Sequence, residues 1–451
     1  MMKSVHRLKC ASKKNGFFFQ LIVCLIISIL VGMILLVCVN LLPQERIKNH
    51  VRDGAAVILQ EHAECQYAEG YVESILDNYT DALILSKVVY PSDHPLKDAV
   101  LVPSYSFPGQ DVEGMQLFGT LNDNPHEDAQ IDTYARYWHG YLVFLKPFFC
   151  FFSYADFRIF NQAVELVLIL VVVVLMQKRN LGSMIPGYIA MIVLWNPGTM
   201  GVSLQYAPCF YVSIGASLII LWRDGLTADF RQDLFLFLFC GILTAYLDFL
   251  TYPIATLGLP LSFWILSEET IFRKRSKKGL LGKSIRICMT WVIGYLGMWA
   301  GKWMLGSLLS RENIVNDAFQ NIVNRTSAKD GEQSLSRFGV VIYLIRYTFG
   351  KWPYLLLMLI LLIVLIGYIL CHGEQLGGSE IVFTKAAHSD KGTIMSLILV
   401  GILPFFWYFF TANHSFIHPR LVYRSMGVTV FAWISALTMI IRKCVWRKTE
   451  K

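Results

Sequence analysis

The sequence predicts an all-α fold: a polytopic bundle of about ten transmembrane helices with cytoplasmic termini and a large first outer loop containing interfacial helices. Of its 451 residues, 55% are hydrophobic and 16% are charged, whereas soluble chains carry about 25% charged residues. Several apolar runs reach the roughly 18–20 residues that a helix needs to cross a bilayer. Lys and Arg lie mainly in short loops, a pattern typical of cytoplasmic anchoring, so the net charge of +8 does not indicate a nucleic-acid partner.

The chain divides into four parts. Residues 1–16 form a basic cytoplasmic N-terminus, residues 17–42 the first transmembrane helix, residues 43–156 an extracytoplasmic loop, and residues 157–451 a polytopic transmembrane domain. The first apolar run is longer than the 7–15 residues of a signal-peptide core, and no small-residue cleavage pattern follows it. We therefore expect an uncleaved helix with its N-terminus inside.

The outer loop alternates helical patterns with breakers. Apolar spacing predicts an amphipathic helix over 45–62 and a second helix over 72–89. Prolines then predict a loop-rich region over 91–125. Residues 132–152 are aromatic and apolar but include Arg, His, Lys and Pro, a composition that favours an interfacial helix.

Nine further spans follow from apolar runs, and the positive-inside rule places their basic loops in the cytoplasm. An aromatic and basic segment at 338–351 is typical of an interfacial helix. The predicted spans are 159–176, 184–195, 207–222, 234–247, 254–266, 287–309, 353–371, 393–411 and 425–441.

Three acids of the outer loop are candidates for proton transfer. Glu73, Asp77 and Asp81 are spaced by four residues, which predicts one helix face. Mutual repulsion can raise the pKa of one carboxyl and suit it to act as a general base. The same oxygens could instead bind a divalent cation, so the sequence allows either role for these acids. The alternative is a solvated acidic face. Asp77 and Asp81 are the preferred catalytic residues because polar side chains surround them.

Other polar residues are candidates for substrate binding. Arg136 and His139 lie among Tyr and Trp residues, and Arg suits phosphate recognition. The alternative is an aromatic belt that anchors a helix at the membrane interface. Asp248 lies at a turn between two apolar helices, where an unpaired acid is costly and often functional. A helix cap is the alternative.

A basic cluster follows the ninth predicted span. His414 and His418 have the i, i+4 spacing of a metal pair, but Pro419 interrupts a regular helix there. Arg420 and Arg424 add positive charge, which disfavours a cation. This cluster therefore favours an anion site, such as a clamp for phosphate or pyrophosphate.

This layout resembles integral membrane glycosyltransferases of the GT-C type, in which a first helix, a large outer loop and many spans follow a short cytoplasmic start. The matching features are that order and the acids Asp77 and Asp81 in the first loop. The resemblance implies a catalytic carboxylate in this loop and a polyprenyl-phosphate-linked sugar donor. In many family members the acidic pair directly follows the first helix, whereas Asp77 lies well downstream of it.

The expected function is transfer of a sugar from a lipid-linked donor to a glycan, lipid or protein acceptor at the outer face, in assembly of cell-surface glycans. The expected location is the plasma membrane, with membrane lipid as a partner and no cofactor beyond an optional divalent cation. One alternative is a lipid-linked oligosaccharide flippase, which would need polar groups near mid-membrane. Another is a non-catalytic membrane protein for surface-polymer assembly.

Overall fold

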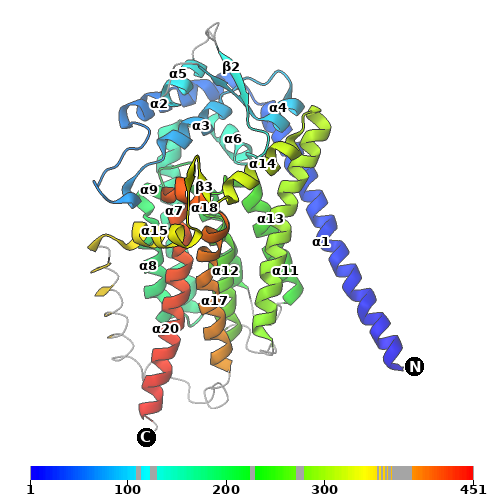
Figure 1. Cartoon of the computed structure of the whole chain (residues 1–451), viewed down its shortest axis with the longest axis vertical. Coiled ribbons are helices and arrows are strands. Elements are labelled where there is room, and N and C mark those ends of the chain that lie inside the picture. The colour runs from blue at the N-terminus through cyan, green and yellow to red at the C-terminus, as the bar shows by residue number, and fades with distance from the viewer. Residues whose placement is uncertain are drawn as a thin grey trace.

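The computed structural model shows a long helical bundle with a smaller cap at one end (Figure 1). It describes residues 2–107, 113–121, 129–223, 229–270, 279–352 and 389–449, with a few isolated residues between 355 and 367. The molecule is predominantly helical, but the all-α prediction omitted two small antiparallel sheets, β1–β2 and β3–β4.

Five helices among the described residues are long and apolar enough to cross a membrane: Gly16–Asn40, Tyr154–Lys178, Phe230–Leu247, Lys391–Phe410 and Pro419–Arg442. Three further predicted spans are shorter apolar helices, and the predicted span 353–371 lies largely outside the described residues. The structure thus supports a helical membrane bundle. The bundle helices are α1 (Met2–Asn40), α7 (Tyr154–Lys178), α8 (Ile185–Trp195), α10 (Ala207–Trp222), α11 (Phe230–Leu247), α12 (Ile254–Thr270), α13 (Leu280–Ser310), α17 (Ser389–Phe410) and α20 (Met426–Thr449).

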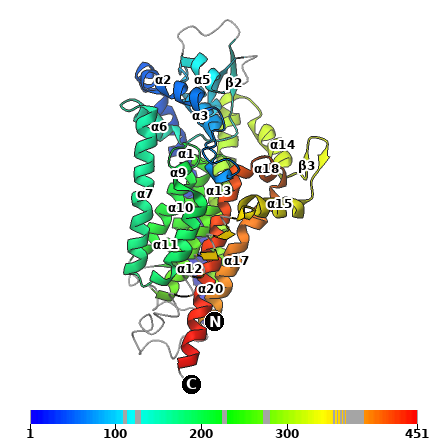
Figure 2. The ribbon, with the colours of Figure 1, turned by 90° about the vertical axis from the view of Figure 1, so that its left-hand side faces the viewer.

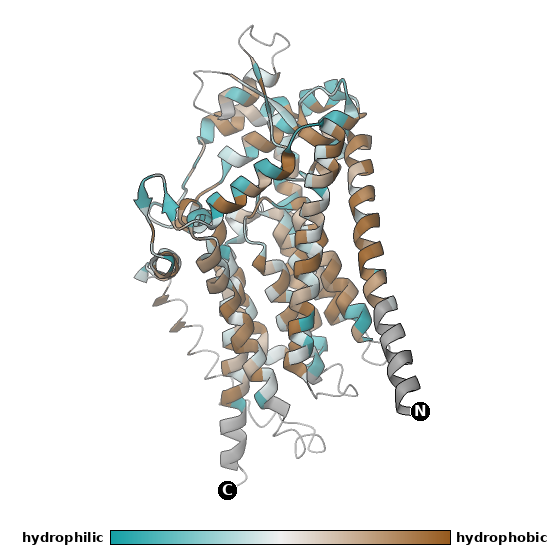
Figure 3. Cartoon of the chain, turned by 45° about the vertical axis from the view of Figure 1, so that its right-hand side comes forward, coloured by the Kyte–Doolittle hydropathy of each residue, from teal (hydrophilic) through white to brown (hydrophobic). Residues whose placement is uncertain are grey.

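Glycines set the closest packing in the bundle. A Cβ atom at Gly241 of α11 would overlap the carbonyl oxygen of Trp291, and one at Gly294 of α13 would overlap the carbonyl oxygen of Leu238. The two backbones can approach this closely only because neither glycine has a side chain. Figure 3 shows hydrophobic residues dominating the bundle helices, with hydrophilic residues concentrated in the cap.

The cap is formed by the described residues between 43 and 152. The predicted outer loop ends at residue 156, whereas α7 already begins at Tyr154. The predicted amphipathic helix is present as α2, which buries Ile47, Val51 and Ile58. The remaining cap elements are η1 (Val72–Ser74), α3 (Asn78–Val88), α4 (Pro95–Leu101), β1 (Pro103–Ser106), α5 (Glu113–Leu121), β2 (Gln130–Thr133) and α6 (Leu142–Phe149), after α2 (Gln44–Glu61).

The prediction of one helix over 132–152 is wrong. Residues 130–133 form strand β2, which pairs antiparallel with β1 from Pro103↔Thr133 to Ser106↔Gln130. Irregular backbone follows, and His139 has a positive φ of 54°, which no α-helical residue adopts. The helix α6 begins only at Leu142. The pairing with β1 is a tertiary contact that overrides local helical periodicity.

A second group of elements lies beside the cap end of the bundle. The predicted interfacial segment 338–351 is largely helix α15, which lies across the bundle direction (Figure 1). This second group comprises α14 (Ile314–Thr326), β3 (Lys329–Asp330), β4 (Gln333–Ser334), α15 (Arg337–Phe349), α18 (Ala412–Ile417), α19 (Pro419–Val422) and η4 (Tyr423–Ser425).

Two short connections between bundle helices complete the described elements: η2 (Gly182–Met184) and α9 (Pro197–Met200).

Candidate functional site

Asp77 is held at the start of α3. Its Oδ1 accepts a hydrogen bond from the backbone N–H of Thr80 at 3.3 Å, which caps the helix. The side chain is 0% exposed, and Oδ2 has no hydrogen-bond partner within the described part of the chain. Burial raises the pKa of Asp77 to about 6, and the negative charge of Asp81 contributes to the rise. Asp77 thus combines a free carboxylate oxygen with a pKa near neutrality.

Asp81 is also buried, but its oxygens are fully engaged. Its carboxylate accepts hydrogen bonds from the Tyr154 hydroxyl at 2.6 Å, the Ser203 hydroxyl at 3.2 Å and the Leu204 backbone N–H at 3.0 Å. Burial raises its pKa, while the Tyr154 hydrogen bond opposes that rise. These bonds connect α3 to α7 and to the segment before α10. Asp81 therefore holds the cap on the bundle.

The predicted common helix face of three acids is wrong. Asp77 is the N-cap of α3, and Glu73 lies in the separate 3-10 helix η1. Only Asp81 lies within α3 itself. The Asp77 backbone leaves the helix because its side chain caps the next turn, a role that Asp commonly takes. The acids are nevertheless close, since the Asp81 charge acts on Asp77.

Two arginines from the distant end of the sequence lie beside Asp77. Arg420 of α19 places Nη2 at 3.6 Å from Asp77 Oδ1, and its Nη1 pairs with the Glu64 carboxylate. Arg424 of η4 is 1% exposed, and its guanidinium lies 3.6 Å from the centre of the Tyr206 ring. Arg424 Nη1 donates to the Arg420 carbonyl at 2.8 Å.

One edge of Arg424 is left without a hydrogen-bond partner in the described part of the chain. Its Nε and Nη2 atoms have no hydrogen-bond partner among the described residues. These two atoms form a parallel pair of donors that matches the oxygens of a phosphate or carboxylate. Because the edge is buried, an anion placed against it would interact more strongly than in water. The positive charge also reaches Asp77 and Glu73.

A second polar cluster surrounds Asp248 and the two histidines. Asp248 accepts hydrogen bonds from the Thr251 backbone N–H and hydroxyl, as a cap does, and burial raises its pKa to about 6. His414 Nε2 donates to the Leu250 carbonyl at 2.8 Å. Arg325 Nη1 donates to His418 Nε2 at 3.2 Å.

Both histidines are neutral near pH 7. Burial lowers the pKa of His414 to about 3 and that of His418 to about 4, with the Arg325 charge contributing. Their ring centres are 5.0 Å apart. The described residues contain no group of three or more His, Cys, Asp or Glu side chains arranged to hold a metal ion.

Arg136 and His139 lie in a separate aromatic cluster. His139 Nδ1 accepts from the Tyr141 hydroxyl at 2.8 Å and Nε2 donates to the Tyr134 carbonyl at 3.0 Å. Burial lowers the pKa of His139 well below its ordinary value. Arg136 lies over the Tyr134 ring and pairs with Asp317 at 3.2 Å. The contacts of these two residues are thus with this cluster and α14 rather than with Asp77.

Sequence reasoning missed several residues that complete the Asp77 surroundings. Tyr206 supports Arg424, Glu64 pairs with Arg420, and Tyr154 anchors Asp81. Each belongs to a different segment, and no spacing rule relates them. Only helix packing brings them together, although a tyrosine at the outer end of an apolar run is a general signal of an interface.

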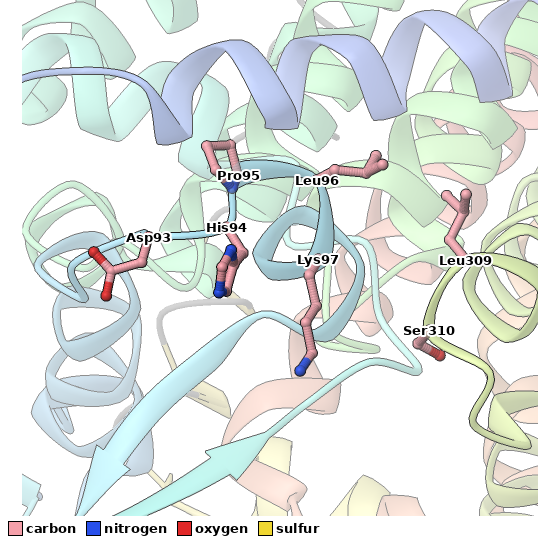
Figure 4. A pocket seen from close by; sticks show the side chains of 7 residues that line it. All are labelled: Asp93, His94, Pro95, Leu96, Lys97, Leu309 and Ser310. Carbon is pink, nitrogen blue, oxygen red and sulfur yellow. The ribbon is translucent and has the colours of Figure 1, made fainter.

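A surface pocket lies away from these clusters. It has a volume of about 530 Å³ and is formed between α4 and the outer end of α13 (Figure 4). None of the predicted site residues lines it. The lining residues are Asp93, His94, Pro95, Leu96, Lys97, Leu309 and Ser310.

Comparisons of the chain with protein-family models, curated proteins and solved structures found no match.

Proposed function

We propose that the protein is a multi-pass plasma-membrane glycosyltransferase that moves a sugar from a polyprenyl-phosphate-linked donor to an acceptor at the extracytoplasmic face. The observation that carries the proposal is the surroundings of Asp77. A buried carboxylate lies 3.6 Å from one arginine and close to a second. One oxygen of the carboxylate and the buried Nε–Nη2 edge of the second arginine have no hydrogen-bond partner among the described residues. A base beside an anion site is the combination that such a transfer needs.

In the proposed reaction, Asp77 Oδ2 takes the proton of an acceptor hydroxyl. The resulting oxygen forms the new bond to the anomeric carbon of the sugar, while the bond from that carbon to the phosphate oxygen breaks. The lipid phosphate leaves with the electron pair. Arg420 and Arg424 stabilise its developing negative charge, and Arg424 offers Nε and Nη2 together.

A lipid-linked oligosaccharide transporter remains the second candidate, and one residue favours it. Glu165 lies inside α7, is 1% exposed and has an Oε2 without a partner among the described residues. Buried acids within spans often mark transport paths. In contrast, the buried Lys302 donates to the Ala99 and Val100 carbonyls of the cap, so its charge is used at the cap end.

The test is sugar transfer by the purified protein in liposomes that contain a panel of polyprenyl-phosphate hexoses. Asp77→Asn is expected to lower transfer by roughly 10²–10⁴-fold, the usual contribution of a general base. Asp93→Asn removes an exposed carboxylate of the same cap and is the matched control. Transfer by Asp77→Asn at the parent rate would exclude Asp77 as the base.

The Asp81→Asn variant tests whether Asp81 has a structural role and not a catalytic one. An asparagine cannot accept all the hydrogen bonds that Asp81 receives, so we expect a loss of about 1–3 kcal/mol of unfolding free energy. The measurement is thermal unfolding in detergent, in which the Asp81→Asn variant should be less stable than the Asp77→Asn variant. The opposite order would mean that the two acids have exchanged roles.

A further inference from the structure

Helix α14 presents three distinct faces. Ile314 and Ala318 are buried and form a narrow packed stripe, which the half-buried Asn321 and Arg325 extend. An apolar face lies next to this stripe and is open. It consists of Val315, Phe319, Ile322 and Val323, which are exposed by 44%, 59%, 36% and 47%. At about 100° per residue, these four side chains cover about 100° of the helix circumference.

The third face of α14 is polar and points toward the cap. It consists of Asn316, Asp317, Gln320 and Asn324. Asp317 pairs with Arg136, which follows strand β2 of the cap. Since the apolar face lies on the opposite side of the helix from Asp317, it points away from the cap.

The direction away from the cap is the direction of the membrane spans. Along the molecule, α14 lies between β2 and α15 in both Figure 1 and Figure 2. The neighbouring α15 also exposes apolar side chains, with Phe338 at 71% and Ile342 at 51%. The open face of α14 is therefore turned toward the level of α15 and the membrane spans, and its polar face toward the cap.

We propose that α14 lies in the interface of the outer membrane leaflet, with its apolar face among lipid acyl chains. An amphipathic helix with apolar and polar faces on opposite sides has the form of such interfacial helices. The exposed Arg311 and Lys329 at its two ends suit lipid phosphates. This inference rests on the membrane placement proposed above, but it does not depend on the glycosyltransferase chemistry.

The packed stripe gives this lipid contact a connection to the candidate site. Arg325 lies at the C-terminal end of α14 and donates to His418. His418 is the residue directly before the short helix α19, which carries Arg420. The position of α14 in the lipid therefore affects the position of the backbone that holds Arg420 beside Asp77.

Photocrosslinking of the full-length protein tests the proposal without removal of its cysteines. A benzophenone amino acid is introduced in place of Phe319 in one variant and of the neighbouring Gln320 in another. Each variant is placed in phosphatidylglycerol–phosphatidylcholine liposomes and irradiated, and the mass of the protein is measured. We expect a phospholipid adduct at position 319 that is at least several-fold more abundant than at position 320.

A third variant distinguishes the possible failures. Leu170 of α7 is 63% exposed on a membrane-length helix, so benzophenone there should give a lipid adduct. An adduct at 170 but none at 319 would overturn the placement of α14 alone, as would a crosslink from 319 to a second protein copy. No adduct at either position would overturn the membrane placement on which the proposal rests.

Discussion

Asp77 has a property that separates it from the other acids of the cap. Both Asp77 and Asp81 are buried, yet only Asp77 keeps an oxygen without a partner among the described residues. The sequence predicted both as catalytic residues and could not rank them, because the donors to Asp81 come from Tyr154, Ser203 and Leu204. These are remote in sequence, and their presence follows only from packing.

The pKa of Asp77 predicts how sugar transfer depends on pH. Because burial raises that pKa to about 6, Asp77 is protonated below this pH and cannot accept a proton from the acceptor. Transfer should therefore rise as pH increases through about 6, with the slope of one ionisation, and then level off. The measurement is the transfer rate between about pH 5 and 8.

Asp248 is the control for this profile, because its pKa is also raised to about 6. Whatever its overall rate, Asp248→Asn should keep the rise at the same pH if Asp77 is the base. Loss of the rise in Asp248→Asn, with its retention in a slow Asp77→Asn variant, would contradict the assignment.

At the scale of elements, periodicity predicted helices well where one face is buried along the whole helix. The predicted helix 45–62 is α2, whose apolar face is buried against other cap helices and α7. The same rule failed over 132–152, where four residues pair with β1 instead. Strand pairing joins residues that are distant in sequence, so the hydrophobic pattern of one segment does not predict it.

The contact between α11 and α13 gives a prediction at this scale. Gly241→Ala should force the two backbones apart, because the added Cβ overlaps the Trp291 carbonyl. We expect a loss of about 1–3 kcal/mol, as for overpacked cores, measured by thermal unfolding in detergent.

Gly215→Ala is the matched control for Gly241→Ala. Gly215 lies in α10, and a Cβ there meets nothing within 4 Å. Since alanine favours helix over glycine by up to about 1 kcal/mol, this variant should be as stable as the parent or more stable. Equal stability of the two variants would show that α11 and α13 are not packed as described.

At the scale of the whole molecule, the polar and apolar parts are segregated along its length. The cap occupies one end, and both chain termini lie at the other (Figure 1). The cytoplasmic location of both termini stays a prediction, which the basic residues near both ends favour.

Protease digestion of intact cells tests this arrangement. A cleavage site inserted after Gly331, between β3 and β4, should be cut from outside because this hairpin belongs to the cap end. Peptide tags at the two termini should survive until the cells are lysed. Cleavage of either tag in intact cells, with the inserted site protected, would reverse the proposed orientation.

The sequence by itself determined the class of the molecule. Long apolar runs indicate membrane-length helices, because burying an uninterrupted apolar surface in lipid depends only on local composition. The structure describes five such helices, and three further predicted spans are shorter apolar helices. The amphipathic helix α2 was likewise readable from its periodicity.

Only the tertiary structure decided which polar residues meet. Asp77 in the first loop and Arg420 near the end of the chain lie 3.6 Å apart, while Arg136 pairs with Asp317 of α14. The sequence predicts both arginines as candidates for substrate binding. Their separation follows from how the helices pack. The pairing of buried charges depends on the relative positions of distant segments, which residue spacing within one segment does not predict.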